Sequence, residues 1–227
     1  MNGDEFMYIA LIILGCIILG YLFGSIPTSV IIGKVFFHKD VRDYGSKNMG
    51  GTNAGRVFGK KIGVIVILLD CLKTIIPIYI AYYVLSLTPL KEFNMASWGY
   101  ATTALSCLIG HCYPCFAGFK GGKAVSCFGG ICLATSWLVS LLGFALFLLI
   151  LKLKKMVSLS SMISSVLIVL ICVGMVYMPN SFGMNNMPND WIYVGLMAVC
   201  SLVLIYRHRE NIKRIINHEE RKISWMK

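Results

Sequence analysis

The sequence predicts an all-α polytopic membrane protein with seven transmembrane helices. Three observations lead to this fold class: the composition, the long uncharged stretches and the distribution of positive charge. Hydrophobic residues make up 57% of the 227 residues and charged residues only 14%, whereas a soluble domain carries about 25% charged residues. The mean hydropathy is +0.75. A soluble helical bundle is the alternative, but its helices would show a polar face, and these stretches do not.

Uncharged stretches of the chain match the length of membrane-spanning helices. They cover residues 6–33, 93–119, 124–151, 156–189 and 191–206, and a helix needs about 20 apolar residues to cross the hydrocarbon. The first stretch follows Asp4 and Glu5, whereas a cleavable signal begins with basic residues. We therefore expect it to remain in the protein as a membrane helix.

The positive charges predict the orientation. Nineteen of the 21 lysines and arginines lie within 34–61, 120–123, 152–155 and 207–227, and such clusters stay in the cytoplasm. The stretch 124–151 could cross once or twice. Two crossings, with a turn near Thr135–Trp137, keep all four clusters on one side, although about 14 residues per helix is short for a span. The expected spans are 6–33, 62–86, 95–116, 121–135, 137–152, 158–178 and 190–206.

This topology places the N-terminus outside and the C-terminus in the cytoplasm. We expect a single integral-membrane domain over residues 1–227. Nine cysteines are scattered through the chain, and their odd number excludes complete internal pairing. Zinc-site patterns such as H-E-x-x-H are absent, so we expect no metal and no other cofactor.

The first polar segment that predicts chemistry runs from Asp40 to Ile62. Gly45-Ser46 and Gly50-Gly51-Thr52-Asn53 supply backbone N–H groups and short polar side chains, and Arg56 follows one turn later. Glycines that expose N–H groups at the start of a helix form an anion site. The alternative is helix packing, because glycines recur every four residues from Gly51 to Gly63 and would form a smooth ridge in one continuous helix.

The second such segment is Phe119-Lys120-Gly121-Gly122-Lys123. Two glycines between two lysines suit a phosphate group, for which lysine serves as a point charge. The spacing of a Walker A loop is absent. The alternative is a basic anchor for anionic lipid heads, but two such segments on one membrane face favour phosphate binding.

Ionisable residues in the apolar stretches are weaker candidates. Asp70 and Lys73 lie three residues apart and can pair on one helix face; they mark either a functional site or a structural ion pair. His111 ends the expected third helix, where a hydrogen bond at the helix end is its ordinary role. Ser158 and Ser161 begin the expected sixth helix, where serine is a common N-cap. The segment from Tyr206 to Arg214 suits a basic helix on the membrane surface.

Together these segments resemble the acyl-phosphate:glycerol-3-phosphate acyltransferase family, commonly called PlsY. The resemblance extends from Gly24 to Glu220, and the family's motifs occur in order. They are G-S-I-P at 24–27, D-x-R-x-x-G-S-x-N-x-G-x-T-N-x-x-R at 40–56, D-x-x-K at 70–73, G-H-x-[FY]-P with F-K-G-G-K at 110–123, V-S-L-x-S at 157–161 and Y-R-H-R-x-N-I at 206–212. The family's seven-helix fold with the N-terminus outside agrees with the topology predicted from charge.

The resemblance implies transfer of a fatty acyl group from acyl phosphate to the 1-hydroxyl of glycerol 3-phosphate, giving lysophosphatidic acid for phospholipid biosynthesis. The site would face the cytoplasm from the bacterial inner (plasma) membrane. We expect the lipid bilayer as surroundings, no nucleic acid partner and function as a monomer. By motif position, the resemblance implies catalytic roles for Arg56, Lys123 and His208 and substrate binding by Ser46, Asn48, Thr52, Asn53, Ser161 and Asn211. The general base is His208, His111 or the acyl phosphate itself.

The sequence departs from the family pattern beside the expected site. Lys47, Thr74, Ala124 and His218 stand where the family usually has glycine, and Gly51 where it has alanine. A diverged paralogue with another acceptor therefore stays open. A transporter or binding protein for a phosphorylated metabolite is the alternative from another class. Transport sites usually lie near the membrane midplane, whereas these polar groups gather at one predicted face.

Overall fold

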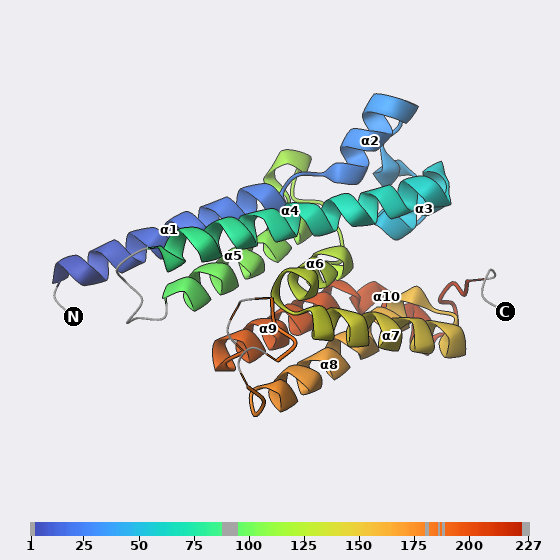
Figure 1. The fold of residues 1–227 in the computed structure, drawn as a ribbon. Helices are drawn as coiled ribbons and strands as arrows, with labels where there is room; N and C mark the ends of the chain where they lie inside the picture. The colour runs from blue at the N-terminus through green and yellow to red at the C-terminus, as the bar shows by residue number, and fades with distance from the viewer. Residues whose placement is uncertain (1–2, 88–94, 180–181, 186, 188, 224–227) are drawn as a thin grey trace. The chain divides into compact units, whose positions relative to one another are not determined.

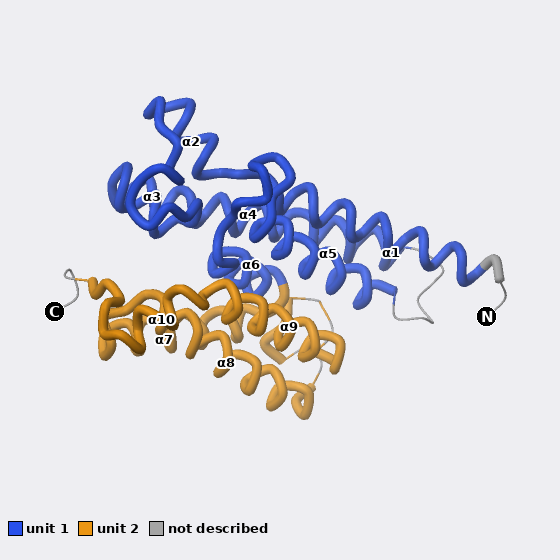
Figure 2. The backbone as a smooth tube through the Cα atoms, turned by 180° about the vertical axis from the view of Figure 1, so that it is seen from behind, with its two compact units in different colours: residues 1–134 blue, residues 135–227 orange. Residues whose placement is uncertain are grey.

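The computed structural model describes residues 3–87, 95–179, 182–185, 187 and 189–223 (Figure 1). In this part of the chain the regular elements are α-helices and short 3-10 helices, which confirms the predicted all-α class. The chain forms two compact units, residues 1–134 and 135–227, coloured separately in Figure 2. That residues 1–227 act as one enzymatic domain stays a prediction.

Unit 1 is built from helices α1 to α6. Their bounds are α1 Gly3–Gly24, α2 Thr28–Phe37, α3 Gly51–Phe58, α4 Lys60–Ser86, α5 Met95–Cys112 and α6 Val125–Thr135, which ends at the unit boundary. The predicted first span, 6–33, is thus two helices with a break at Ser25–Pro27. Pro27 has no amide hydrogen and disfavours helical geometry in the residue before it, so α1 ends first. The Nζ of Lys73 donates to the carbonyl oxygen of Ile26 at 2.7 Å and so supports the break.

Small residues allow α1 and α5 to pack at close range. A Cβ added at Gly20 would lie 2.2 Å from the carbonyl oxygen of Thr103, and one at Gly24 would lie 2.0 Å from that of Cys107. Helices in lipid gain little from the hydrophobic effect, so close van der Waals contact through glycine stabilises their association. Any larger residue at these two glycines would push the helices apart.

The glycines at positions 51, 55, 59 and 63 do not lie on one continuous helix. Gly59 has φ +98° and separates α3 from α4, because glycine adopts positive φ without steric cost. The two helices then pack against each other. A Cβ added at Gly63 of α4 would lie 2.7 Å from the Cα of Gly55 and 2.9 Å from the carbonyl oxygen of Gly51. These glycines therefore make a helix-packing contact, which was the alternative.

Unit 2 contains helices α7 to α10. Their bounds are α7 Trp137–Lys154, α8 Val157–Met175, α9 Trp191–Arg207 and α10 Arg209–Ile216. The predicted break near Thr135–Trp137 is confirmed. Ser136 is the N-cap of α7 and its hydroxyl accepts a hydrogen bond from the Val139 amide at 3.1 Å. The angle between α9 and α10 is 59°, so the basic tail helix begins at Arg209 rather than Tyr206.

Among the described residues, four helical segments are long and apolar enough to cross a membrane, and a fifth qualifies if α9 and α10 form one bent span. Helix α6 has 11 residues, fewer than the about 20 of a full crossing. Large apolar side chains such as Leu11, Leu68 and Phe144 are exposed on α1, α4 and α7, as lipid contact requires. The count of seven spans and the orientation stay predictions.

Candidate functional site

Asn53 organises the first glycine loop, residues 40–50. Its side chain is buried inside the loop, with 1% of the residue exposed. Nδ2 donates to the carbonyl oxygens of Val41, Tyr44 and Asn48 at 2.9, 3.1 and 2.8 Å. Oδ1 accepts from the amide of Ser46 at 2.7 Å. One amide side chain therefore fixes the path of the loop, and a substitution there would release the backbone on both sides of Ser46.

Two contacts join this loop to the second glycine loop, residues 113–124. The Nδ2 of Asn48 donates to the carbonyl oxygen of Gly121 at 3.3 Å, and the guanidinium of Arg42 donates to that of Ala117 at 2.7 Å. Arg42 also binds both carboxylate oxygens of Asp40. Its hydrogen bond holds the pKa of the Asp40 carboxyl below the usual value. The structure thus brings together the two loops that the sequence singled out separately.

The N-terminus of α3 lies at the end of the first loop. Gly50 is its N-cap, and the first amides of a helix have no carbonyl partner within it. The partial positive charge of these amides favours an anion. Thr52 and Arg56 are exposed one turn apart on α3, and Ser46 is exposed in the loop before it. A hydroxyl, helix amides and a guanidinium are therefore presented from one short segment.

The second loop is packed against His111. The amide of Gly122 donates to the carbonyl oxygen of His111 at 2.9 Å. A Cβ added at Gly122 would lie 1.9 Å from Nε2 of His111, and one at Gly121 would lie 2.1 Å from its carbonyl oxygen. Both glycines are required by this contact. The loop then leads through the half-buried Lys123 into α6.

Asp70 and Lys73 form a buried ion pair, as their spacing predicted. The Nζ of Lys73 lies 2.9 Å from Oδ1 of Asp70, and the Thr28 hydroxyl donates to the same oxygen at 2.6 Å. The Nδ1 of His111 lies 3.7 Å from it. Because Lys73 also binds the helix break at Ile26, the pair connects α2, α4 and α5. These contacts favour a structural ion pair over a functional site.

The predicted site residues of unit 2 are buried at the joint of its helices. Ser161 donates to the carbonyl oxygen of Val157 at 2.8 Å. The Nδ1 of His208 lies 2.8 Å from the carbonyl oxygen of Leu204. A carbonyl only accepts hydrogen bonds, so in a neutral ring Nδ1 carries the hydrogen and Nε2 is the basic nitrogen. His208 lies between α9 and α10, and its contact with the Leu204 carbonyl oxygen orients the ring.

The carboxylate of Glu220 collects three hydrogen bonds, a group we call the Glu220 cluster. Oε1 accepts from Ser158 Oγ and from Asn211 Nδ2, both at 2.7 Å, and Oε2 accepts from Arg214 Nε at 2.8 Å. Burial alone would raise the pKa of Glu220, but these hydrogen bonds outweigh it, so the pKa lies below its usual value. Ser158 is thus not the N-cap of α8. Met156 takes that position.

Comparison with known proteins assigns the family. A model of the glycerol-3-phosphate acyltransferase family matches residues 14–218. The chain belongs to this family. A glycerol-3-phosphate acyltransferase of Listeria monocytogenes serotype 4b (strain F2365) is 41% identical over 220 residues, which are 97% of this chain and 100% of that protein. One of Staphylococcus haemolyticus is 39% identical over 212 residues, covering 92% and 97% of the two chains.

Solved structures of this acyltransferase family show the same fold. The crystal structure of PlsY, an integral membrane glycerol 3-phosphate acyltransferase, in its glycerol 3-phosphate form has a TM-score of 0.79 and 36% identity. It covers 93% of this chain and 96% of that chain. The lysophosphatidic acid form gives 0.77 and 35%. Together with the apolar helices, these findings make the chain a multi-pass integral membrane acyltransferase.

Three positions at which the resemblance leads us to expect glycine have a left-handed backbone in this acyltransferase. Lys47, Ala124 and His218 have φ of +54°, +67° and +58°, the left-handed region that costs other residues about 1–2 kcal/mol. The left-handed backbone at these three positions is therefore formed without glycine. Thr74 differs, since its hydroxyl donates to the carbonyl oxygen of Asp70 within α4. Gly51 contacts Ile67, where a Cβ would lie 2.4 Å from Cγ1.

Sequence reasoning missed the residues that hold the site residues in place. Arg214 was assigned only to the basic helix predicted on the membrane surface, Glu220 was not given a role, and Arg42 was one cation among several. What could have drawn attention to Glu220 in the sequence is that the family resemblance extends to this residue. In the part of the chain that the structure describes, no group of three or more His, Cys, Asp or Glu could hold a metal ion. The absence of a cofactor stays a prediction.

Proposed function

We propose that this chain transfers a fatty acyl group from acyl phosphate to the 1-hydroxyl of glycerol 3-phosphate, giving lysophosphatidic acid. The relatives are named glycerol-3-phosphate acyltransferase, and the two PlsY structures are a glycerol 3-phosphate form and a lysophosphatidic acid form. The observation that carries the proposal for this chain is the joining of its two glycine loops through Asn48 and Gly121. Arg56 lies on α3, directly after the first loop, and Lys123 lies in the second loop. Two cations held in this way suit two phosphate-bearing substrates.

The chemistry requires charge stabilisation more than a nucleophilic side chain. The 1-hydroxyl oxygen attacks the acyl carbonyl carbon, the bond from that carbon to the phosphate oxygen breaks, and inorganic phosphate leaves. Acyl phosphate is already activated, so no covalent enzyme intermediate is needed. Arg56 and Lys123 offset the repulsion between the two anions and stabilise the departing phosphate. Glycine amides add neutral donors to the same task.

The remaining predicted residues fall into three roles. Ser46, Asn48 and Thr52 bind phosphate oxygens from the first loop and the start of α3. Asn53 acts by shaping the first loop, since its side-chain atoms bind the backbone there. Ser161 and Asn211 bind substrate in unit 2, and His208 is the general base. Its Nε2 is the basic nitrogen when Nδ1 bonds to Leu204, as proton abstraction requires.

We further propose seven crossings of the bacterial plasma membrane, with the N-terminus outside, the site at the cytoplasmic face and a monomer as the working form. The four positive clusters support this orientation. A topology reporter fused after Lys155 should read cytoplasmic, and one inserted near Asn185 should read external. An external reading after Lys155 would mean that residues 124–151 cross once.

The test is product formation by the purified chain in detergent. With palmitoyl phosphate and labelled glycerol 3-phosphate we expect labelled lysophosphatidic acid, undiminished by a chelator. With palmitoyl-CoA as the donor we expect none. Dependence on acyl-CoA, or loss of activity on chelation, would reject this mechanism. A transporter would make no product in detergent, yet would move glycerol 3-phosphate into vesicles.

A further inference from the structure

The corner between α1 and α2, residues 25–29, carries three buried hydroxyl groups. Ser25 and Ser29 are 0% exposed and Thr28 is 8% exposed. A buried hydroxyl destabilises the fold unless it forms a hydrogen bond. The partners of these hydroxyls therefore show which segments of unit 1 the corner supports.

Ser29 supports the end of the first glycine loop. Its hydroxyl donates to the carbonyl oxygen of Met49 at 2.5 Å, across 20 positions of the sequence. Met49 is fully buried and precedes Gly50, the N-cap of α3. The bond therefore fixes the backbone directly before the first amides of α3, whose partial positive charge favours an anion.

The same corner contacts the start of the second glycine loop. The Oγ of Ser25 accepts a hydrogen bond from the amide of Cys115 at 3.4 Å. One helical turn earlier, the hydroxyl of Tyr21 donates to the carbonyl oxygen of Tyr113 at 2.9 Å. The end of α1 and the corner thus hold the second loop at two points, while Ser29 holds the first.

The buried ion pair of α4 fixes the corner itself. The Nζ of Lys73 donates to the carbonyl oxygen of Ile26, and the hydroxyl of Thr28 donates to Oδ1 of Asp70. In a continuous helix the Ile26 carbonyl would accept from the amide four residues later, whereas at the break the Lys73 ammonium donates to it. Ser29 therefore acts from a base that is anchored to a long helix.

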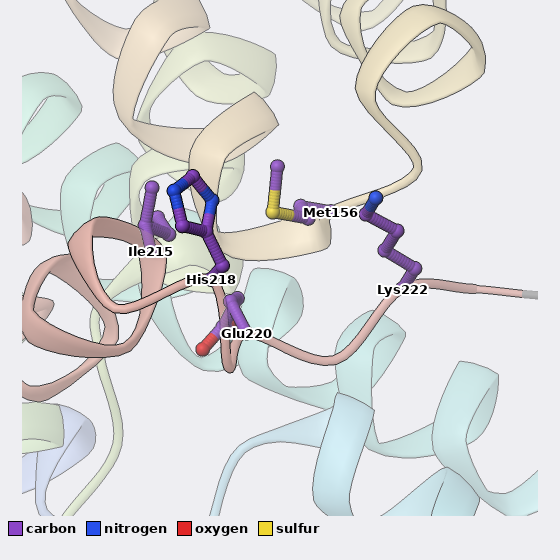
Figure 3. Close-up of a pocket in the computed structure, with 5 residues that line it drawn as sticks. All are labelled: Met156, Ile215, His218, Glu220 and Lys222. Atoms are coloured by element: carbon purple, nitrogen blue, oxygen red, sulfur yellow. The ribbon is translucent and has the colours of Figure 1, made fainter.

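The Ser29 contact is more closely packed than the surroundings of Glu220 in unit 2. There a pocket of about 110 Å³ is lined by Met156, Ile215, His218, Glu220 and Lys222 (Figure 3). A polar space of that size can admit water, which replaces a lost polar contact. Met49 instead packs with Val30 and Val41 in a buried apolar cluster. If the Ser29 hydroxyl is removed, the Met49 carbonyl and the loop must move to reach another donor.

We propose that Ser29 is a positioning residue that fixes the first glycine loop relative to the second, and with it the groups that bind substrate phosphate. This inference rests on the proposed function, in which the two loops bind the phosphate groups of the two substrates. Ser29 is buried and acts through the Met49 carbonyl on the start of α3. Loss of its hydroxyl weakens substrate binding and leaves the helices of unit 1 in place.

The experiment is steady-state kinetics of Ser29→Ala on the full chain in detergent, with palmitoyl phosphate and glycerol 3-phosphate varied in turn. The KM of at least one substrate should rise about five- to tenfold, with kcat within about twofold of the wild type. Ser106→Ala is the matched control, because the buried Ser106 hydroxyl bonds within α5 to the carbonyl oxygen of Thr103 at 3.1 Å. Both of its KM values should stay within about twofold.

A fall in kcat with both KM values unchanged would overturn the positioning role, because it reports loss of active protein and not a displaced loop. Wild-type kinetics of Ser29→Ala would overturn it too, as would an equal rise in KM for Ser106→Ala. If Ser29→Ala fails to accumulate, Ser29→Cys fills the same space with a weaker donor and meets the same criterion. No product from the wild type would overturn the proposed function, whereas product with unchanged KM values in the Ser29 variant would overturn the role of Ser29 alone.

Discussion

Unit 1 and unit 2 hold their predicted site residues by different means. In unit 1 the neutral Asn53 amide fixes the first loop, and Gly121 and Gly122 fit against His111. One charged side chain, Arg42, adds a contact between the two loops. In unit 2 the support is an ionised carboxylate with three donors. The first arrangement depends on shape, and a single added carbon disrupts it. The second depends on charge, so pH and charge-removing substitutions should affect it most.

The largest effect should come from two cations of unit 1, Arg56 on α3 and Lys123 in the second loop. Losing one charge-assisted contact to phosphate costs about 1.5–3 kcal/mol. Arg56→Ala and Lys123→Ala should therefore each lower kcat/KM by about tenfold to over a hundredfold, while the protein still inserts. The comparison is steady-state kinetics on matched amounts of detergent-extracted protein. Near-normal kcat/KM for both variants would remove the loops of unit 1 from the site.

A second prediction tests whether shape controls unit 1. Gly122→Ala places a Cβ 1.9 Å from Nε2 of the buried His111, so the second loop must shift. We expect kcat/KM to fall about tenfold. Gly129→Ala is the control, because nothing lies within 4 Å of its added Cβ. Equal activities of these two variants would show that the glycine fit does not matter.

A third prediction tests whether charge controls unit 2. The pKa of Glu220 is lower in the folded chain than its ordinary value, so the unfolded chain takes up the proton first. The stabilisation is complete above the ordinary pKa of a glutamate and is lost as pH falls through the folded-state pKa. The melting temperature of the wild type should therefore drop below about pH 5 more steeply than that of Glu220→Gln. Parallel profiles for the two proteins would contradict this account, and Glu219→Gln should follow the wild type.

The smallest effect should come from Lys47. It is exposed and has φ +54°, so Lys47→Gly removes backbone strain without loss of packing. The gain is offset in part by the greater freedom of glycine in the unfolded chain, leaving about 0.5 kcal/mol of stabilisation. Activity should stay within a few fold. Lys47→Ala, which keeps a Cβ, is the control for the lost charge and should not be stabilised. Loss of activity in Lys47→Gly alone would indicate a rebuilt site with another acceptor.

The sequence was informative wherever local patterns decide structure. Pro27 and Ser136 mark helix boundaries through the chemistry of their own residues, although only the second break was predicted. Glycine spacing predicted close packing, but the positive φ of Gly59 changed one helix into two. Asp70 and Lys73 are neighbours on one helix, so their ion pair could be predicted from spacing alone.

Contacts between distant segments were beyond sequence reasoning. Glu220 meets Ser158 across 62 positions, and Asn48 meets Gly121 across 73. Nothing in a polar residue reveals that its partner lies so far along the chain. The contacts of Asn53 could not be predicted either. A motif shows that an amide side chain is present, but it does not show which groups that side chain binds.

Equilibrium binding tests most directly whether the glycine loops of unit 1 hold substrate phosphate, because it separates binding from turnover. Calorimetric titrations of the full chain in detergent would use glycerol 3-phosphate and, separately, a non-hydrolysable acyl phosphonate. We predict that Lys123→Ala weakens at least one of these affinities by more than about tenfold, while Lys47→Gly leaves both unchanged. Unaltered affinity of Lys123→Ala for both ligands would contradict the account.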